Sequence, residues 1–230
     1  MKRPVVLISP LLAPSLIMAP LASRLRDEGF AATIFAYPSY REDIPSNAAR
    51  LAAFLQEHGE AEVDVVAFSM GGIILRWAAN NHALPRIRRA VLVGTPNQGA
   101  RMAKKANDWF GDLFPLFWGK CARQLQPGDL GLCQRAGRLA EDTELGIIAG
   151  GTGRERGVNP ILPGDNDRVV TVAETWLEGT DDFVLVRRPH GPLILSTETA
   201  RLTAHFLREG AFQPGGLRTP HPKAPKPCPT

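Results

Sequence analysis

The sequence of 230 residues predicts a single α/β domain in which helices cover both faces of a mostly parallel sheet. Short apolar runs rich in β-branched residues recur along the chain, as expected for strands that are buried on both faces. Between them lie segments whose apolar residues are spaced at i, i+3, i+4 and i+7, which is typical of amphipathic helices. Strands that alternate with helices favour a parallel sheet, because a parallel crossover needs a connection of about the length of a helix.

Three strands and two helices are predicted before residue 69. The first strand is read from the apolar run RPVVLIS, the second from AATIFAY, and the third from the run that leads into Ser69. The two helices are expected to end at Gly29 and Gly59, because glycine commonly follows the last turn of a helix. The strands are residues 3–9, 31–37 and 62–68, and the helices are residues 18–29 and 48–59.

Three further strands and two helices follow. A helix continues after Ser69, since residues 73, 74, 77 and 78 are apolar and share one helical face. The last helix runs from Ser196 to Gly210, because serine favours the N-cap of a helix and glycine the position after its end. The predicted strands are residues 87–94, 144–151 and 182–188.

Residues 95–135 interrupt the alternation of strands and helices. A connection of this length in a compact domain is usually functional, so we expect the part from about 97 to 135 to form a cap over a site. The alternative is that its aromatic side chains pack into a satellite core. The aromatic residues are Trp109, Phe110, Phe114, Phe117 and Trp118.

Residues 211–230 are rich in proline and are expected to form a disordered tail, so the predicted domain spans residues 1–210. The formal net charge of the chain is +4, and three of these charges belong to Arg218, Lys223 and Lys226 in the tail. The rest of the chain is therefore close to neutral, which gives little support to a nucleic-acid partner.

The chain has three cysteines, Cys121, Cys133 and Cys228. They are too few and too scattered for a disulfide framework or a zinc site. We expect free thiols, with a bridge between Cys121 and Cys133 as the alternative, and we expect neither a metal nor a cofactor.

The amino-terminal stretch begins with two basic residues and an apolar run, which is the pattern of a secretory signal. Pro10, Pro14 and Pro20 interrupt the run, and a strand, a loop and the start of a helix explain it better. No apolar run free of proline and charge reaches the ~20 residues that span a membrane. We therefore expect a cytoplasmic protein without stable membrane insertion, and its oligomeric state stays open.

The stretch VVAFSMGG, residues 65–72, places Ser69 where a strand gives way to a helix. A strand, a sharp turn and a helix form the geometry that exposes a nucleophilic serine at the carboxyl edge of a sheet. Gly71 fits this turn, because the chain folds back where a side chain would clash. Ala67 occupies the position at which such a motif usually has glycine.

A nucleophilic serine needs a base and a group that orients the base, and in this kind of fold an acid and then a histidine follow it along the chain. The loop PGDNDRVV after the fifth strand offers Asp165 and Asp167. We favour Asp167, because an aspartate beside glycine, such as Asp165, suits a turn. His190 is the only one of the five histidines that comes directly after a predicted strand. Glu174 and Asp182 are interpreted as charges on the solvent face.

These residues resemble those of small bacterial lipases and esterases of the α/β-hydrolase superfamily. The likeness runs from about residue 4 to about residue 212. The resemblance implies the α/β-hydrolase fold, with about six strands in the order 2-1-3-4-5-6 and Ser69 beside the switch point between the first and third strands. The likeness rests on the Tyr37-Pro38-Ser39 loop, AFSMGG, the segment GTPNQG at 94–99, the acid loop GDNDRVV, and the final His190 loop with the helix after it.

The resemblance also implies the roles of the site residues. One N–H of the oxyanion hole would come from Met70, directly after the nucleophile, and a second from Leu11 in the loop after the first strand. The family usually has His-Gly in that loop, whereas this chain has Ser9-Pro10. Proline has no N–H and fixes its φ near −65°, so the geometry of the loop has to differ. The implied catalytic triad is Ser69, Asp167 and His190.

We therefore expect a serine hydrolase that cleaves carboxylic esters through an acyl-enzyme, with a small-molecule substrate whose apolar acyl group lies under the aromatic cap. The same acyl-enzyme would serve an acyltransferase, a thioesterase or an amidase. A non-catalytic homologue that binds a lipid or a partner is a further alternative, and the Ser9-Pro10 loop is the feature that favours it.

Overall fold

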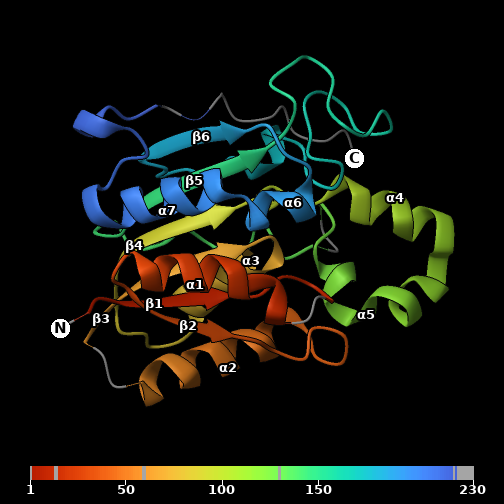
Figure 1. Ribbon diagram of the computed structural model, residues 1–230. Helices are drawn as coiled ribbons and strands as arrows, with labels where there is room; N and C mark the ends of the chain where they lie inside the picture. Colours follow the sequence, from red (N-terminus) through yellow and green to blue (C-terminus); the bar gives the residue numbers. More distant parts are fainter. Residues whose placement is uncertain (1, 13–14, 59–60, 129–130, 220, 222–230) are drawn as a thin grey trace.

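The computed structural model describes residues 2–12, 15–58, 61–128, 131–219 and 221. Its centre is a six-stranded parallel sheet in the order β2-β1-β3-β4-β5-β6, with helices on both sides (Figure 1). The predicted strands and their order are confirmed, with strand ends that differ by no more than two residues. The strands are β1 (Pro4–Ile8), β2 (Ala31–Phe35), β3 (Glu62–Phe68), β4 (Arg86–Val93), β5 (Glu144–Gly150) and β6 (Asp182–Val186).

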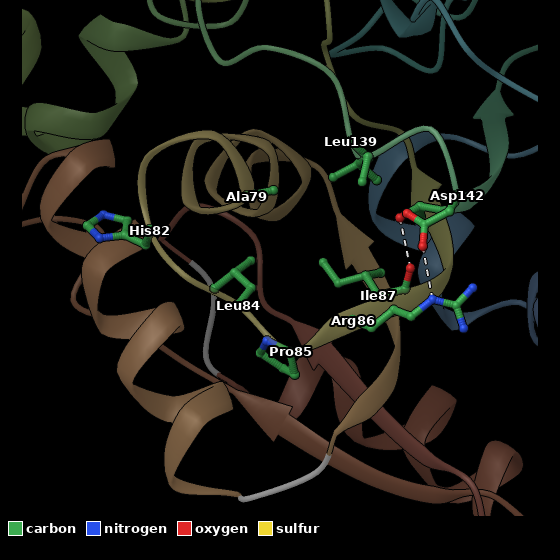
Figure 2. Close-up of a pocket in the computed structure, with 10 residues that line it drawn as sticks. Ala79, His82, Leu84, Pro85, Arg86, Ile87, Leu139 and Asp142 are labelled. Atoms are coloured by element: carbon green, nitrogen blue, oxygen red, sulfur yellow. Dashed lines mark hydrogen bonds and ion pairs between the residues drawn. The ribbon is translucent and has the colours of Figure 1, made fainter.

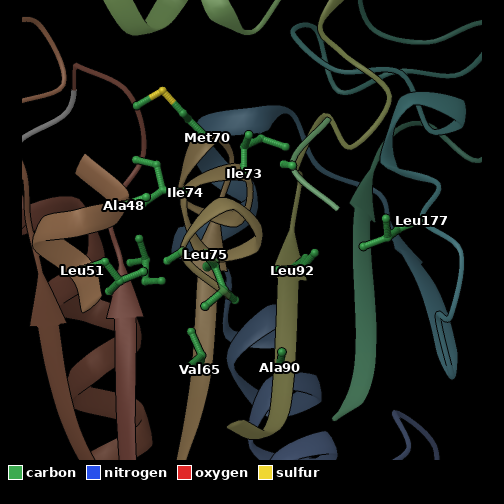
Figure 3. Packing of buried hydrophobic residues seen from close by; sticks show 14 of the residues in the cluster. Ala48, Leu51, Val65, Met70, Ile73, Ile74, Leu75, Ala90, Leu92 and Leu177 are labelled. Carbon is green, nitrogen blue, oxygen red and sulfur yellow. The ribbon is translucent and has the colours of Figure 1, made fainter. Parts of the chain in front are cut away.

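Two hydrophobic cores lie on the two faces of the sheet. Successive strand residues point to opposite faces, so Val5 and Leu7 of β1 join one core, and Val6 and Ile8 join the other. Figure 3 shows part of the second core, where apolar side chains of α2 and α3 meet those of β3 and β4. The first core is covered by α1 (Ala19–Asp27), α6 (His190–Leu195) and α7 (Thr197–Glu209), and the second by α2 (Ile44–Glu57) and α3 (Met70–Asn81).

Ala67 is fully buried in the second core, opposite Ile8 of β1 and Leu92 of β4. A glycine there would lose a buried methyl group, worth about 0.8 kcal/mol, and would add roughly 0.5–1 kcal/mol of backbone entropy cost. We expect Ala67→Gly to lower the free energy of unfolding by about 1–2 kcal/mol in urea denaturation. Ala31→Gly, at the exposed start of β2, is the control and should show only the smaller backbone part. An unchanged or higher stability of Ala67→Gly would contradict this packing role.

The capping residues predicted from the sequence locate the ends of some helices but not of all. Ser196 Oγ accepts the Thr199 N–H at 3.0 Å, and Gly210 adopts a left-handed φ of 75°, so both predicted caps of α7 are confirmed. The short helix α6 was not predicted: His190, expected on a loop, is instead its first residue. Gly59, expected to stop the second helix, lies outside the described residues.

The predicted cap contains two helices at the carboxyl edge of the sheet, joined by a 3-10 turn (Figure 1). They are α4 (Arg101–Phe110) and α5 (Phe114–Gln124). Phe114 is buried in a small cluster against which Trp118 packs, as the satellite-core alternative requires. The other aromatic side chains form open apolar surface: Trp109, Phe110 and Phe117.

Residues 211–219, assigned from the sequence to the tail, pack against the edge strand β6. Phe212 is buried, and the N–H groups of Phe212 and Thr219 donate to the Asp182 carboxylate at 2.6 and 2.7 Å. Asp182 is only 1% exposed, so its interpretation as a solvent-face charge is wrong, because these backbone partners cover it. Residues 220 and 222–230 of the predicted tail lie outside the described residues.

Glu174 is a second buried acid that was interpreted as a surface charge. Its two carboxylate oxygens accept the N–H groups of Arg101 and Thr171, each at 2.7 Å. Burial raises the pKa of Glu174, while these hydrogen bonds oppose the shift. The carboxylate therefore links the start of α4 to the acid loop between β5 and β6.

Cys121 and Cys133 are both buried free thiols, which rules out the alternative of a bridge between them. Burial raises the pKa of each thiol to about 12. Cys228 lies outside the described residues. Within the described ranges, no helix combines the length and apolarity needed to cross a membrane.

Candidate active site

Ser69 lies in a tight turn between β3 and α3. Its φ of 54° and ψ of −124° place it in a region that costs a non-glycine residue on the order of 1–3 kcal/mol. The Ser69 N–H donates to the Val93 carbonyl at 2.8 Å, which ties the turn to the end of β4. Ser69 is the N-cap residue of α3, but its hydroxyl does not cap the helix. The Oγ atom is therefore available to other partners at the positive end of the helix dipole.

The two glycines after Met70 allow α3 to approach the neighbouring loops closely. A Cβ atom on Gly71 would lie 2.8 Å from the carbonyl oxygens of Ile8 and Ser9. A Cβ atom on Gly72 would overlap the Thr95 side chain. The pair of glycines thus sets the distance between the Ser69 turn and the ends of β1 and β4.

His190 is placed by α6 so that its ring reaches Ser69. The His190 Nε2 atom lies 3.0 Å from Ser69 Oγ. The ring packs against Phe68, with ring centroids 4.9 Å apart, and a Cβ atom on Gly94 would lie only 3.2 Å from it. The His190 side chain is 14% exposed, so one part of the ring faces solvent while the rest is held by packing.

Asp167 holds the other side of the His190 ring. Its Oδ2 atom lies 2.6 Å from His190 Nδ1, and its Oδ1 atom accepts the N–H groups of Val169 and Val170 at 2.9 and 2.7 Å. The backbone N–H of His190 also donates to the backbone carbonyl of Asp167 at 2.8 Å. The carboxylate is nearly inaccessible to solvent, so it is fixed on both oxygens.

Asp165, the other acid considered from the sequence, faces a different loop. Its carboxylate accepts the N–H groups of Thr152 and Gly153, each at 2.8 Å, and the Thr152 hydroxyl at 3.0 Å. Asp165 therefore orders the turn after β5, and Asp167 is the carboxylate that the structure brings to His190.

The residues expected to form the oxyanion hole flank the Ser69 turn. Ile8 pairs with Ala67 in the sheet, so the loop after β1 runs beside the turn after β3. The Leu11 side chain packs against the small cluster of the cap. Within the described ranges, the Leu11 N–H has no hydrogen-bond acceptor. Met70 begins α3, where a helix N–H has no intrahelical acceptor.

Strained backbone angles occur in three loops around the Ser69 turn. Among the residues that the structure describes, three non-glycine residues have such angles: Leu12 at 53°, Ser69 at 54° and Arg168 at 95°. Each lies in a different loop around the site, after β1, β3 and β5. This placement matches the tendency of strained backbone to gather at functional sites.

A surface pocket lies at the other edge of the sheet (Figure 2). Arg86 begins β4 and forms an ion pair with Asp142 at 2.9 Å beside this pocket, whereas Ser69 follows the end of the parallel strand β3. The pocket is therefore remote from the Ser69 turn. In the part of the chain that the structure describes, no group of three or more His, Cys, Asp or Glu side chains could hold a metal ion.

Several solved structures share this fold with the chain. A lipase from Bacillus licheniformis, BlEst2 in its mature form, is 20% identical with a TM-score of 0.69, over 90% of this chain and 91% of the lipase. A carboxylesterase structure from the thaumarchaeon Nitrososphaera gargenis is 15% identical with a TM-score of 0.58, over 91% of each chain. The metagenomic carboxyl esterase MGS0156 is 14% identical with a TM-score of 0.58, over 83% of this chain and 65% of the esterase.

The sequence itself matches no family of described function. Residues 21–116 match a family model described as a domain of unknown function, DUF7379. No curated protein matches the chain. The strand order and the structural neighbours establish that the chain has the α/β-hydrolase fold, so the fold implied by the sequence resemblance is confirmed.

Proposed function

We propose that the protein hydrolyses carboxylic esters through an acyl-enzyme formed on Ser69. Ser69 Oγ attacks the ester carbonyl while His190 Nε2 takes the proton of the Ser69 hydroxyl. The histidine then gives that proton to the leaving alcohol. Asp167 holds the Nδ1–H of the imidazole, so that Nε2 is free to act as the base. A water molecule, activated by the same histidine, then releases the acid.

The observation that carries the proposal is the continuous chain of hydrogen-bond contacts from Ser69 Oγ through His190 to Asp167, at 3.0 and 2.6 Å. A serine hydroxyl needs this arrangement to act as a nucleophile at neutral pH. The N–H groups of Leu11 and Met70 would stabilise the oxyanion from the other side of Ser69. The structural neighbours, a lipase and carboxylesterases, support a reaction of this class.

The substrate that we propose is a small ester with an apolar acyl group. The segment 97–135 is proposed as the cap of the domain. Its helices α4 and α5 lie at the carboxyl edge of the sheet (Figure 1), the edge at which Ser69 follows β3. Both helices carry exposed apolar side chains. Such surface favours contact with an apolar group over contact with a charged one. The cytoplasmic location predicted from the sequence belongs to the same proposal.

Labelling with a fluorophosphonate probe tests the proposal. We expect the probe to label the native protein on one residue, Ser69, identified by peptide mass spectrometry, and to leave Ser69→Ala unlabelled. The Ser69 hydroxyl caps no helix, so Ser69→Ala should keep the melting temperature of the native chain. Heat-denatured protein is the control for non-specific labelling. Equal labelling of the native chain and Ser69→Ala, or no labelling of the native chain, would refute the proposal.

A further inference from the structure

The loop after β1, which carries Leu11, is held by two side chains from the segment that follows β2. The Tyr37 hydroxyl donates to the Ser9 carbonyl at 2.6 Å. The Leu12 N–H donates to Ser39 Oγ at 3.0 Å. Leu11 therefore lies between two residues whose backbone groups are each fixed by a side chain.

The backbone of this loop needs such support. Pro10 lacks an N–H and has a fixed φ, so it cannot anchor the loop through its own amide. Leu12 has a left-handed φ of 53°, a conformation that costs a residue with a Cβ atom on the order of 1–2 kcal/mol. The Ser39 hydroxyl accepts the Leu12 N–H in this conformation and so stabilises it. Without that acceptor, Leu12 would relax and carry Leu11 with it.

Both supporting side chains are themselves well fixed. Ser39 is buried, with 7% of its surface exposed. The Tyr37 ring stacks on Phe35, with ring centroids 5.7 Å apart. Burial raises the pKa of the Tyr37 hydroxyl well above its usual value, so it stays protonated and can donate throughout the range of ordinary assays.

We propose that Tyr37 and Ser39 are positioning residues that fix the Leu11 N–H as an oxyanion donor. A glycine at position 10 would let the backbone adopt the required geometry freely. With Pro10 at this position, the two hydrogen bonds from Tyr37 and Ser39 hold the loop in that geometry instead. The inference rests on the proposed function, because it concerns the same reaction at Ser69. Among the described residues, neither side chain forms a hydrogen bond to Ser69, Asp167 or His190.

The test removes each hydroxyl separately, in Ser39→Ala and Tyr37→Phe. Losing one oxyanion donor costs about 10²–10³ in rate, so we expect a partly misplaced Leu11 to lower kcat by about 10- to 100-fold. KM should change by less than about twofold, because the donor acts on the transition state. An alkyl boronic acid forms a tetrahedral adduct with the serine and occupies the oxyanion site. Its inhibition constant should rise by a factor close to the fall in kcat.

The chain offers a matched control for the loss of a hydroxyl. Ser46→Ala removes an exposed hydroxyl on α2, away from the loop after β1. This variant should keep the kcat of the native protein.

Three results would overturn the inference. These are an unchanged kcat in both Ser39→Ala and Tyr37→Phe, a fall in kcat with no change in boronate affinity, and a rise in KM together with a general loss of thermal stability. A failure of the proposed function would look different, since the native protein itself would then resist the fluorophosphonate probe.

Discussion

Replacing His190 with alanine is expected to lower kcat by about 10⁶-fold, because loss of the base in a serine triad removes nearly the whole catalytic effect of the triad. His190 Nε2 is the base that lies at 3.0 Å from Ser69 Oγ, so without it the serine keeps its proton. KM should change little, since the imidazole acts on the serine and not on the bound ester. Initial rates with a chromogenic acyl ester measure both parameters.

A matched control distinguishes loss of the base from loss of any histidine. His82 is exposed at the end of α3 and lies at the pocket on the other edge of the sheet, so His82→Ala should keep the activity of the native chain (Figure 2). His190→Gln retains more of the side-chain volume against Phe68 and tests whether packing explains the effect. A rate for His190→Ala within tenfold of the native rate would exclude His190 as the base.

Asp167→Asn is expected to lower kcat by about 10⁴-fold, the usual effect of this change in a serine triad. The reason is specific to the contacts of the carboxylate. Its Oδ1 atom accepts the N–H groups of Val169 and Val170, so an asparagine would keep its carbonyl oxygen there and turn its NH₂ group toward His190. The imidazole would then carry its proton on Nε2 and could not accept the proton of Ser69.

Asp165→Asn is the comparison that separates the two acids of the loop. Asp165 binds the Thr152 and Gly153 N–H groups, so its replacement should lower the free energy of unfolding by about 1–3 kcal/mol. Its kcat should stay within about tenfold of the native value, because the Asp167 to His190 contact is untouched. A larger loss of kcat in Asp165→Asn than in Asp167→Asn would reverse the assignment. Urea denaturation and steady-state kinetics on the same samples give both quantities.

The sheet and the positions of Ser69, Asp167 and His190 could be predicted because they depend on local patterns. Buried parallel strands are continuous apolar runs, and the carboxyl ends of parallel strands meet at one edge of the sheet. A serine, an aspartate and a histidine that each follow a strand are thus brought to that edge. The choice between Asp165 and Asp167 needed the structure, because both lie in one loop and only their partners differ.

The parts that sequence reasoning missed depend on partners far along the chain. Asp182 is buried because it accepts the backbone N–H groups of Phe212 and Thr219. Glu174 is buried because it accepts the backbone N–H of Arg101. No local sequence pattern predicts such contacts. The cap was predicted as a segment but not as helices. The apolar residues of α4 do recur at helical spacing, so this helix could have been recognised: Met102, Ala103, Ala106, Trp109 and Phe110. In α5 the pattern is broken, because Gly119, at a φ of 78°, interrupts the helix.

The three left-handed residues around the site carry a consequence for the evolution of this scaffold. Leu12, Ser69 and Arg168 hold backbone conformations that glycine would adopt more easily, and they lie where the chemistry is proposed. Substitutions that let these residues adopt ordinary φ angles would raise the stability of the fold, but they would place the site residues less accurately. We therefore expect a laboratory selection for heat resistance and one for turnover to yield substitutions in the same three loops. The two selections would favour opposite changes there.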